Sequence, residues 1–131
     1  MATSTIRTVV PCGIKKVWDT VTAVNQYSWR SDLSRTEILN EAQFIEYTKS
    51  GYPTTFTTTV WEPCRRWEFR MENSNMEGIW IGTFAQIAEG TELTFTEHVT
   101  ARKCFLKPFV KFYLKKQQAQ FVADLKAALS R

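Results

Sequence analysis

The segment at residues 107–130 constrains the fold more than any other part of this chain. It contains no glycine and one proline, Pro108, at a position that suits the first turn of a helix. At 1.5 Å per residue, a helix of this length would be about 36 Å long. One narrow arc of the helix is mostly apolar and consists of Leu106, Val110, Leu114, Gln117, Phe121, Leu125 and Ala128. Such a helix must lie across another structural layer.

That other layer is predicted to be a β-sheet, because about ninety residues before the helix alternate between apolar and polar side chains. The alternation is clearest at residues 66–72, where Trp67, Phe69 and Met71 share one side and charged residues share the other. Short connections between consecutive strands favour antiparallel pairing with one buried face. The expected strands are residues 3–10, 35–41, 43–49, 54–62, 66–72, 76–87 and 91–100.

Two short helical segments are expected between the first and second strands. After Pro11, the side chains of Ile14, Val17, Trp18 and Val21 recur at helical spacing, which predicts a short amphipathic helix. Residues 25–32 are predicted to form a second short helix or a turn, which Asn25 could cap. We therefore predict an α+β helix-grip fold, with a curved antiparallel sheet of about seven strands wrapped around a long C-terminal helix.

Size and charge narrow the function classes. The 131 residues suit a single domain, and no apolar stretch is long enough for a transmembrane helix. The N-terminus does not resemble a signal peptide, so we expect a cytoplasmic location, with Cys12, Cys64 and Cys104 as reduced thiols. The net charge of +4 belongs to the terminal helix, because acidic residues outnumber basic ones before residue 102. We therefore expect no nucleic-acid partner.

The order of elements and several short motifs resemble the START-like, or SRPBCC, superfamily. This superfamily includes birch-pollen-allergen-like proteins and the polyketide cyclase/dehydrase and lipid-transport group. The matching residues are Ile6, Pro11, Val17-Trp18, Tyr27-Ser28-Trp29, Trp61-Glu62-Pro63, Arg66-Trp67-Glu68-Phe69, Trp80-Ile81-Gly82-Thr83-Phe84 and Gly90-Thr91-Glu92-Leu93-Thr94. One departure is Cys12-Gly13, where family members often have an acidic or other polar residue, so helix capping is expected to differ there.

The resemblance implies a deep cavity between the curved sheet and the last helix. Members of the superfamily bind sterols, lipids, polyketides and other apolar small molecules, and a minority catalyse cyclisation or dehydration. The superfamily shares no single catalytic set, so the resemblance transfers no catalytic residue to this chain. It supports fold more strongly than function.

Few residues suggest catalysis, metal binding or nucleotide binding. The single histidine, His98, is on the opposite face of its predicted strand from Leu93 and Phe95 and is therefore expected to face solvent. The chain has no nucleophile elbow, P-loop, dinucleotide fingerprint or His/Cys cluster with metal-ligand spacing. We accordingly expect no metal and no cofactor.

Glu97 is the one candidate for acid/base chemistry. It shares the inner face of its predicted strand with Leu93 and Phe95, and desolvation there would raise the pKa of its carboxyl group. The alternatives are that a bulge turns Glu97 to solvent or that an arginine pairs with it. A second positioned polar group would be needed for a strong catalytic case.

Aromatic side chains on the inner faces predict an apolar cavity with a few polar groups, as in small-molecule sites. Core packing alone would explain many of these rings, including Trp18, Trp67 and Phe69. The predicted polar groups include Gln117, which interrupts the apolar stripe and needs hydrogen-bond partners if buried. The predicted ligand-binding residues are Trp29, Phe56, Thr58, Trp80, Phe84, Phe95, Glu97, Tyr113, Gln117 and Phe121.

The start of the last helix suggests a further possibility. Residues 102–116 hold six basic side chains, no acidic ones and four aromatics. Phe105, Phe109 and Phe112 point away from the apolar stripe, so they could contact an anionic membrane or a partner protein, including a second copy in a homodimer. The alternative, which we favour from sequence, is that they close the mouth of the cavity.

Three functional hypotheses follow from the sequence. The leading one is a non-catalytic carrier or sensor of a hydrophobic or amphipathic small molecule of the lipid, polyketide or aromatic type. The second is an enzyme of the cyclase/dehydratase type with Glu97 as acid/base. The third is a membrane- or protein-interaction module that uses residues 102–116.

Overall fold

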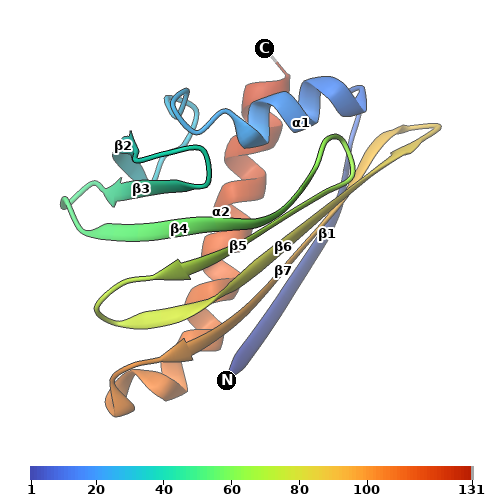
Figure 1. Cartoon of the computed structure of the whole chain (residues 1–131). Coiled ribbons are helices and arrows are strands. Elements are labelled where there is room, and N and C mark those ends of the chain that lie inside the picture. Colours follow the sequence, from blue (N-terminus) through green and yellow to red (C-terminus); the bar gives the residue numbers. More distant parts are fainter. Residues whose placement is uncertain (131) are drawn as a thin grey trace.

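A seven-stranded antiparallel sheet and one long helix dominate the computed structural model, which describes residues 1–130 (Figure 1). The strands lie in the order β1-β7-β6-β5-β4-β3-β2, so the first strand forms one edge of the sheet and pairs with the last strand. The elements are β1 (Ala2–Val10), α1 (Ile14–Thr22), β2 (Leu33–Ile38), β3 (Gln43–Thr48), β4 (Pro53–Glu62), β5 (Arg66–Glu72), β6 (Met76–Ile87), β7 (Gly90–Ala101), the 3-10 helix η1 (Cys104–Phe109) and α2 (Val110–Leu129). The predicted helix-grip fold is confirmed.

The predicted faces of the strands are also confirmed. Burial alternates along the whole of β7, where Leu93, Phe95 and Glu97 are buried and their neighbours are half-buried on the outer face. A glycine lies at the connection from β3 to β4 and another at the connection from β6 to β7. Gly51 and Gly90 have φ values of 86° and 138°, and glycine adopts such positive values without strain.

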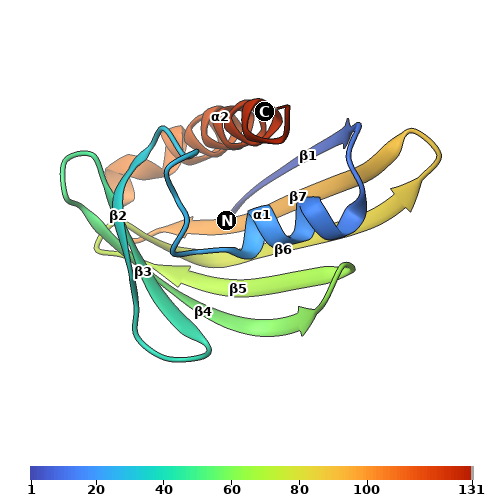
Figure 2. The same cartoon turned by 90° about the horizontal axis from the view of Figure 1, so that it is seen from above.

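The sheet curves around the inside of the molecule (Figure 2). Helix α2 packs against β1 and β7, whereas β3, β4 and β5 arch away from it. The short helix α1 lies over β6 and β7 and contacts α2. Its first backbone amide, at Ile14, has no side-chain cap at Gly13 and donates instead to Gln86 Oε1 at 3.0 Å. Capping by β6 thus replaces the polar residue that the family often has after the proline.

Two details of the helices differ from the sequence predictions. Residues 23–32 form turns, so the second short helix of the predicted fold is absent within residues 1–130, and the turn alternative holds. The isolated turn bond from the Arg30 amide to the Tyr27 carbonyl, at 2.8 Å, does not propagate into a helix. The terminal helix also starts differently, because Pro108 lies inside η1 and α2 begins at Val110.

Helix α2 is rotated by about one residue from its predicted orientation. The expected stripe holds at Val110, Leu114 and Leu125, but Gln118, Val122 and Leu129 are buried in place of Gln117, Phe121 and Ala128. The reason is that α2 packs against β1 and β7 at one side of the sheet rather than across its centre. The neighbouring stripe, Tyr113, Gln117 and Phe121, consequently faces the hollow beside the helix.

Candidate functional site

A cavity of about 670 Å³ lies between the arched half of the sheet and α2. At one end it is lined by the loop after α1, including Val24 and Trp29, and at the other by Asn73 and Asn75, together with Leu106 of η1. The predicted ligand-binding residues that line it are Trp29, Phe56, Trp80, Phe95, Glu97, Tyr113, Gln117 and Phe121.

Stacked aromatic rings form the wall on the sheet side. Phe69 and Trp80 lie parallel with ring centroids 4.7 Å apart, and Phe44 and Phe56 stack in the same way at 4.9 Å. Phe95 tilts against Trp80 at 5.0 Å. These residues alternate along β3 to β7, and their rings are buried. The sequence therefore builds an apolar wall whose rings hold one another in place.

Trp80 also covers Gly82, its neighbour two residues along the same face of β6. A Cβ atom at position 82 would overlap carbons of the Trp80 ring. The glycine therefore lets the indole lie flat on the strand instead of projecting into the cavity. The Trp80-Ile81-Gly82 motif sets how much of the cavity remains open.

Glu97 is the buried carboxyl group of the cavity wall. It lies on β7 opposite Ser4 of β1 and Trp80 of β6, and only 6% of its surface is exposed. Its Oε2 atom has no hydrogen-bond partner among residues 1–130. Burial away from water raises the pKa of Glu97 to about 7. The two alternatives, a bulge that exposes Glu97 and an arginine that pairs with it, are both absent within residues 1–130.

Tyr113 lies across the cavity from the sheet, on the first turn of α2. Desolvation is the main cause that raises the pKa of its phenol, and the nearby carboxyl groups of Glu97 and Asp32 raise it further. The residue is 48% exposed, so its ring forms part of the rim rather than the floor. The phenol therefore remains protonated at neutral pH and can donate a hydrogen bond.

The buried amide of α2 is Gln118 rather than the predicted Gln117. Its Oε1 accepts a hydrogen bond from the Ser4 hydroxyl at 2.8 Å, and its Nε2 donates to the carbonyls of Ser4 and Phe95 at 3.0 and 3.3 Å. Gln118 is thereby satisfied by the protein and fastens α2 to β1 and β7. Gln117 is half-buried, lines the cavity and has no hydrogen bond from its side chain within residues 1–130.

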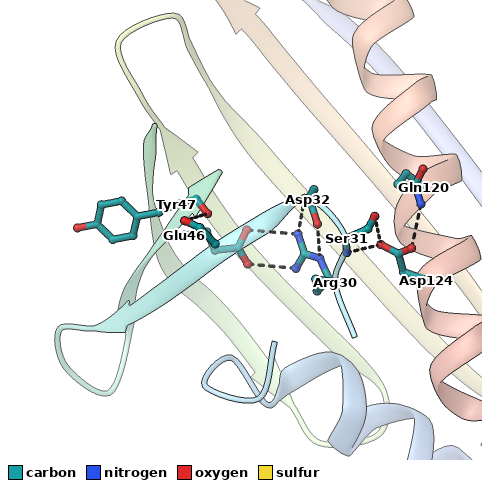
Figure 3. A network of polar contacts seen from close by, with 8 residues as sticks. Arg30, Ser31, Asp32, Glu46, Tyr47, Gln120 and Asp124 are labelled. Carbon is teal, nitrogen blue, oxygen red and sulfur yellow. Dashed lines mark hydrogen bonds and ion pairs between the residues drawn. The ribbon is translucent and has the colours of Figure 1, made fainter. Parts of the chain in front are cut away.

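A polar network centred on Arg30 ties the loop at residues 23–32 to the sheet (Figure 3). The guanidinium group of Arg30 forms ion pairs with Asp32 at 3.0 Å and with Glu46 of β3 at 3.2 Å. It also lies 4.8 Å from the centre of the Phe121 ring on α2. Burial raises the pKa of Glu46, and the charge of Arg30 offsets part of that rise. The network forms one wall of the cavity.

The same loop is also tied to α2. The backbone amide and the hydroxyl of Ser31 both donate to Asp124 Oδ2 at 2.8 Å, and Gln120 donates to Oδ1 at 2.8 Å (Figure 3). Desolvation alone would raise the pKa of Asp124, but these hydrogen bonds outweigh it and lower the pKa. The loop thus bridges the sheet and the helix over the cavity.

Sequence reasoning missed Arg30, Asp32 and Glu46 as cavity residues. One signal was present, since Glu46 is two residues from the buried Phe44 on a strand and therefore shares its inner face. A buried carboxylate that stays ionised is stabilised by a cationic partner, and the partner of Glu46 could not be identified because it comes from a loop.

Two predicted site residues and His98 lie elsewhere. The Thr58 hydroxyl accepts a hydrogen bond from the Trp67 indole at 3.1 Å, and Phe84 packs edge-on against Trp18 of α1 at 4.9 Å. Neither belongs to the described lining of the cavity. His98 is on the outer face of β7, as expected, where its Nδ1 lies 2.9 Å from the Thr3 hydroxyl.

Metal binding and membrane spanning are two further features to consider for residues 1–130. Within that range, no group of three or more His, Cys, Asp and Glu side chains is placed to hold a metal ion. None of the helices described there is both long enough and apolar enough to cross a membrane.

Known structures share this architecture at low sequence identity. A START superfamily protein from Mycobacterium smegmatis is 13% identical, with a TM-score of 0.85 over 99% of this chain and 98% of that chain. Protein MLL2253 from Mesorhizobium loti is 14% identical, with a TM-score of 0.82 over 98% and 97%. DynU16, a protein of the dynemicin biosynthetic locus, is 21% identical, with a TM-score of 0.72 over 99% of this chain and 48% of that chain.

No curated protein matches the chain by sequence. These structural likenesses support the fold alone, and the family assignment comes from a family model. The model described as polyketide cyclase / dehydrase and lipid transport matches residues 1–130. The chain therefore belongs to the polyketide cyclase/dehydrase and lipid transport family.

Proposed function

We propose that the protein binds an amphipathic small molecule in the cavity between sheet and helix, as a carrier or sensor. The ligand would be mostly apolar and would carry one hydroxyl or similar group that hydrogen-bonds to Glu97. The observation that carries the proposal is the buried Glu97 carboxyl group, which faces a cavity lined by aromatic rings and lacks a protein partner for Oε2 within residues 1–130.

The cavity has the size and lining of a small-molecule site. Its volume of about 670 Å³ is within the usual range of roughly 300–1,000 Å³. A buried polar atom without a partner is costly, and a ligand hydroxyl would remove that cost. With a pKa of about 7, Glu97 can either donate or accept this hydrogen bond near neutral pH. The family description, which includes lipid transport, agrees with an apolar ligand.

Binding of two fluorescent compounds tests this proposal. Pyrene and 1-hydroxypyrene differ by one hydroxyl group, and titration of each into the protein gives its dissociation constant. We expect both to bind and 1-hydroxypyrene to bind roughly tenfold more tightly, as one charge-assisted or buried hydrogen bond would give. The preference should survive in Glu97→Gln, which keeps a hydrogen-bonding group, and disappear in Glu97→Leu.

The matched control for these variants is Glu92→Gln, on the outer face of β7. Because position 92 faces away from the cavity, this variant should bind both compounds as the wild type does. If neither pyrene nor 1-hydroxypyrene binds to the wild type, the cavity proposal is overturned. An unchanged preference in Glu97→Leu would overturn the role of Glu97 alone.

A second candidate function is dehydration or cyclisation with Glu97 as acid/base. A carboxyl group whose pKa is about 7 is suited to proton transfer at neutral pH. The test is the loss of water from an aromatic β-hydroxyketone, followed by the absorbance of the conjugated enone. Glu97→Gln should abolish this reaction and keep binding. If wild type and Glu97→Gln form enone at the same rate, this candidate is removed and the carrier proposal remains.

A further inference from the structure

The 3-10 helix η1 and the first turn of α2 carry three exposed phenylalanines. Phe105, Phe109 and Phe112 are 70%, 65% and 83% exposed, which is unusual for large apolar side chains. They lie on η1 and the first turn of α2, which project beyond the end of the sheet (Figure 1). Large apolar residues grouped in this way mark an interaction site more often than single exposed residues do.

The lysines among these rings give the surface a positive charge. Lys103, Lys107 and Lys111 are all exposed, and none of them forms an ion pair within residues 1–130. Arg102 differs, because it pairs with Glu72 at 3.2 Å and with Glu77 at 3.3 Å. We call the group of Lys103, Phe105, Lys107, Phe109, Lys111 and Phe112 the aromatic–basic surface.

We propose that the aromatic–basic surface docks on an anionic phospholipid bilayer. Alternating phenylalanine and lysine side chains suit the boundary between headgroups and acyl chains, because the rings enter the apolar layer while the ammonium groups reach the phosphates. Each lysine near an anionic membrane contributes roughly a fivefold gain in binding. Several weak contributions of this kind together give reversible attachment.

A protein partner fits this surface less well than a bilayer does. Cores of protein–protein interfaces are depleted in lysine, whereas here a lysine flanks each phenylalanine. A symmetric contact with a second copy would bring two positive surfaces together, which charge repulsion opposes. Charge complementarity therefore favours the anionic lipid surface.

The aromatic–basic surface is continuous with the cavity. Phe109 belongs to both, and Leu106 beside it also lines the cavity. Phe105 and Phe112 are exposed and outside the described cavity lining, so these two rings do not close the mouth of the cavity as the sequence analysis favoured. Docking would thus hold this end of the cavity at the bilayer, yet it needs no ligand in the cavity. The docking proposal is independent of the proposed small-molecule function.

Vesicle co-sedimentation of the full chain tests the docking. The vesicles are phosphatidylcholine alone, or phosphatidylcholine with phosphatidylserine at about 30%. We expect at least tenfold tighter binding to the mixed vesicles at low salt, and weaker binding as salt increases. Both the double variant Phe105→Ser/Phe112→Ser and the double variant Lys103→Glu/Lys107→Glu should lose at least tenfold in binding.

Matched controls place equivalent changes on other exposed surfaces. Ile38→Ser/Leu39→Ser removes two side chains that are 57% and 46% exposed, and Lys49→Glu/Lys126→Glu reverses two exposed charges outside the aromatic–basic surface. Both control variants should bind mixed vesicles within about twofold of the wild type. All variants change exposed side chains, so their unfolding midpoints should equal that of the wild type, which excludes misfolding as the cause of lost binding.

Three results would overturn the docking proposal. The first is that the wild type does not bind mixed vesicles. The second is that the control variants lose as much binding as the test variants. The third is that the protein self-associates through Phe105 and Phe112 and does not bind vesicles. The last result would identify a second copy as the occupant. Binding of 1-hydroxypyrene to Phe105→Ser/Phe112→Ser should be unchanged, which separates failure of docking from failure of ligand binding.

Discussion

Glu97 provides a quantitative test of the cavity through the pH dependence of stability. The carboxyl group has an ordinary pKa of 4.5, and burial raises it to about 7 in the folded protein. Each pH unit between the two values corresponds to about 1.4 kcal/mol, so full ionisation of Glu97 destabilises the fold by about 3 kcal/mol. The folded state binds the extra proton, and stability therefore decreases as the pH rises from 4.5 through 7.

The variant Glu97→Gln removes this ionisation and keeps the size of the side chain. Between pH 5 and pH 8, the wild-type protein should lose about 2–3 kcal/mol more free energy of unfolding than Glu97→Gln does. Urea unfolding at both pH values, followed by tryptophan fluorescence, gives the four free energies. The comparison uses the difference between the two pH values for each protein, so any pH-independent effect of the substitution cancels.

Glu92→Gln is the control for this experiment, because it changes a carboxyl group on the outer face of the same strand and leaves Glu97 in place. It should keep the wild-type pH dependence. Parallel losses of stability in the wild type and Glu97→Gln would show that the Glu97 carboxyl group is hydrated in the folded protein. The argument for a dry polar group in an apolar cavity would then be refuted.

Three further predictions concern other parts of the fold. Gln118→Leu should lower the free energy of unfolding by about 2–3 kcal/mol in urea unfolding, because three buried hydrogen bonds are lost, whereas Gln117→Leu should change it little. Gly82→Ala should push the Trp80 indole into the cavity and weaken 1-hydroxypyrene binding at least tenfold in a fluorescence titration; unchanged binding would contradict the geometry. Asp124→Ala should speed hydrogen exchange of the Ser31 amide at least tenfold by NMR, because that amide loses its acceptor.

The sheet was predictable from sequence because the side chains of a strand alternate strictly between its two faces. That rule placed Glu97 on the inner face of β7 and His98 on the outer one, without knowledge of any neighbouring strand. The same rule implies that Glu46 shares a face with Phe44, although the sequence analysis did not apply it to Glu46. Where a strand end is covered by another element, the rule is insufficient. Phe84 faces inward but packs beneath α1, away from the cavity.

The orientation of α2 was less predictable, because two overlapping arcs of this helix are both suitable for burial. One arc contains Gln117 and Phe121, and the other contains Gln118 and Val122. The choice depends on which strands the helix contacts, and contacts between distant segments do not appear in local periodicity. The buried glutamine was therefore predicted one residue too early.

The loop at residues 23–32 was the least predictable part of the site. Its shape depends on Arg30 and Ser31, whose partners lie on β3 and α2. The sequence distance between Ser31 and Asp124 is ninety-three residues, and no pattern within the loop indicates that pairing. A turn held by distant side chains cannot be distinguished from a short helix by local propensity alone.

The two arcs of α2 explain together why this fold contains a cavity. The arc with Gln118 is fastened to β1 and β7, so the helix cannot move towards the middle of the sheet without breaking buried hydrogen bonds. The rings on β3 to β6 cannot move towards the helix either, because they stack on one another and β4 and β5 continue the curve of the sheet. Neither wall can collapse onto the other at low cost, and the space between Glu97 and Tyr113 remains available to a ligand.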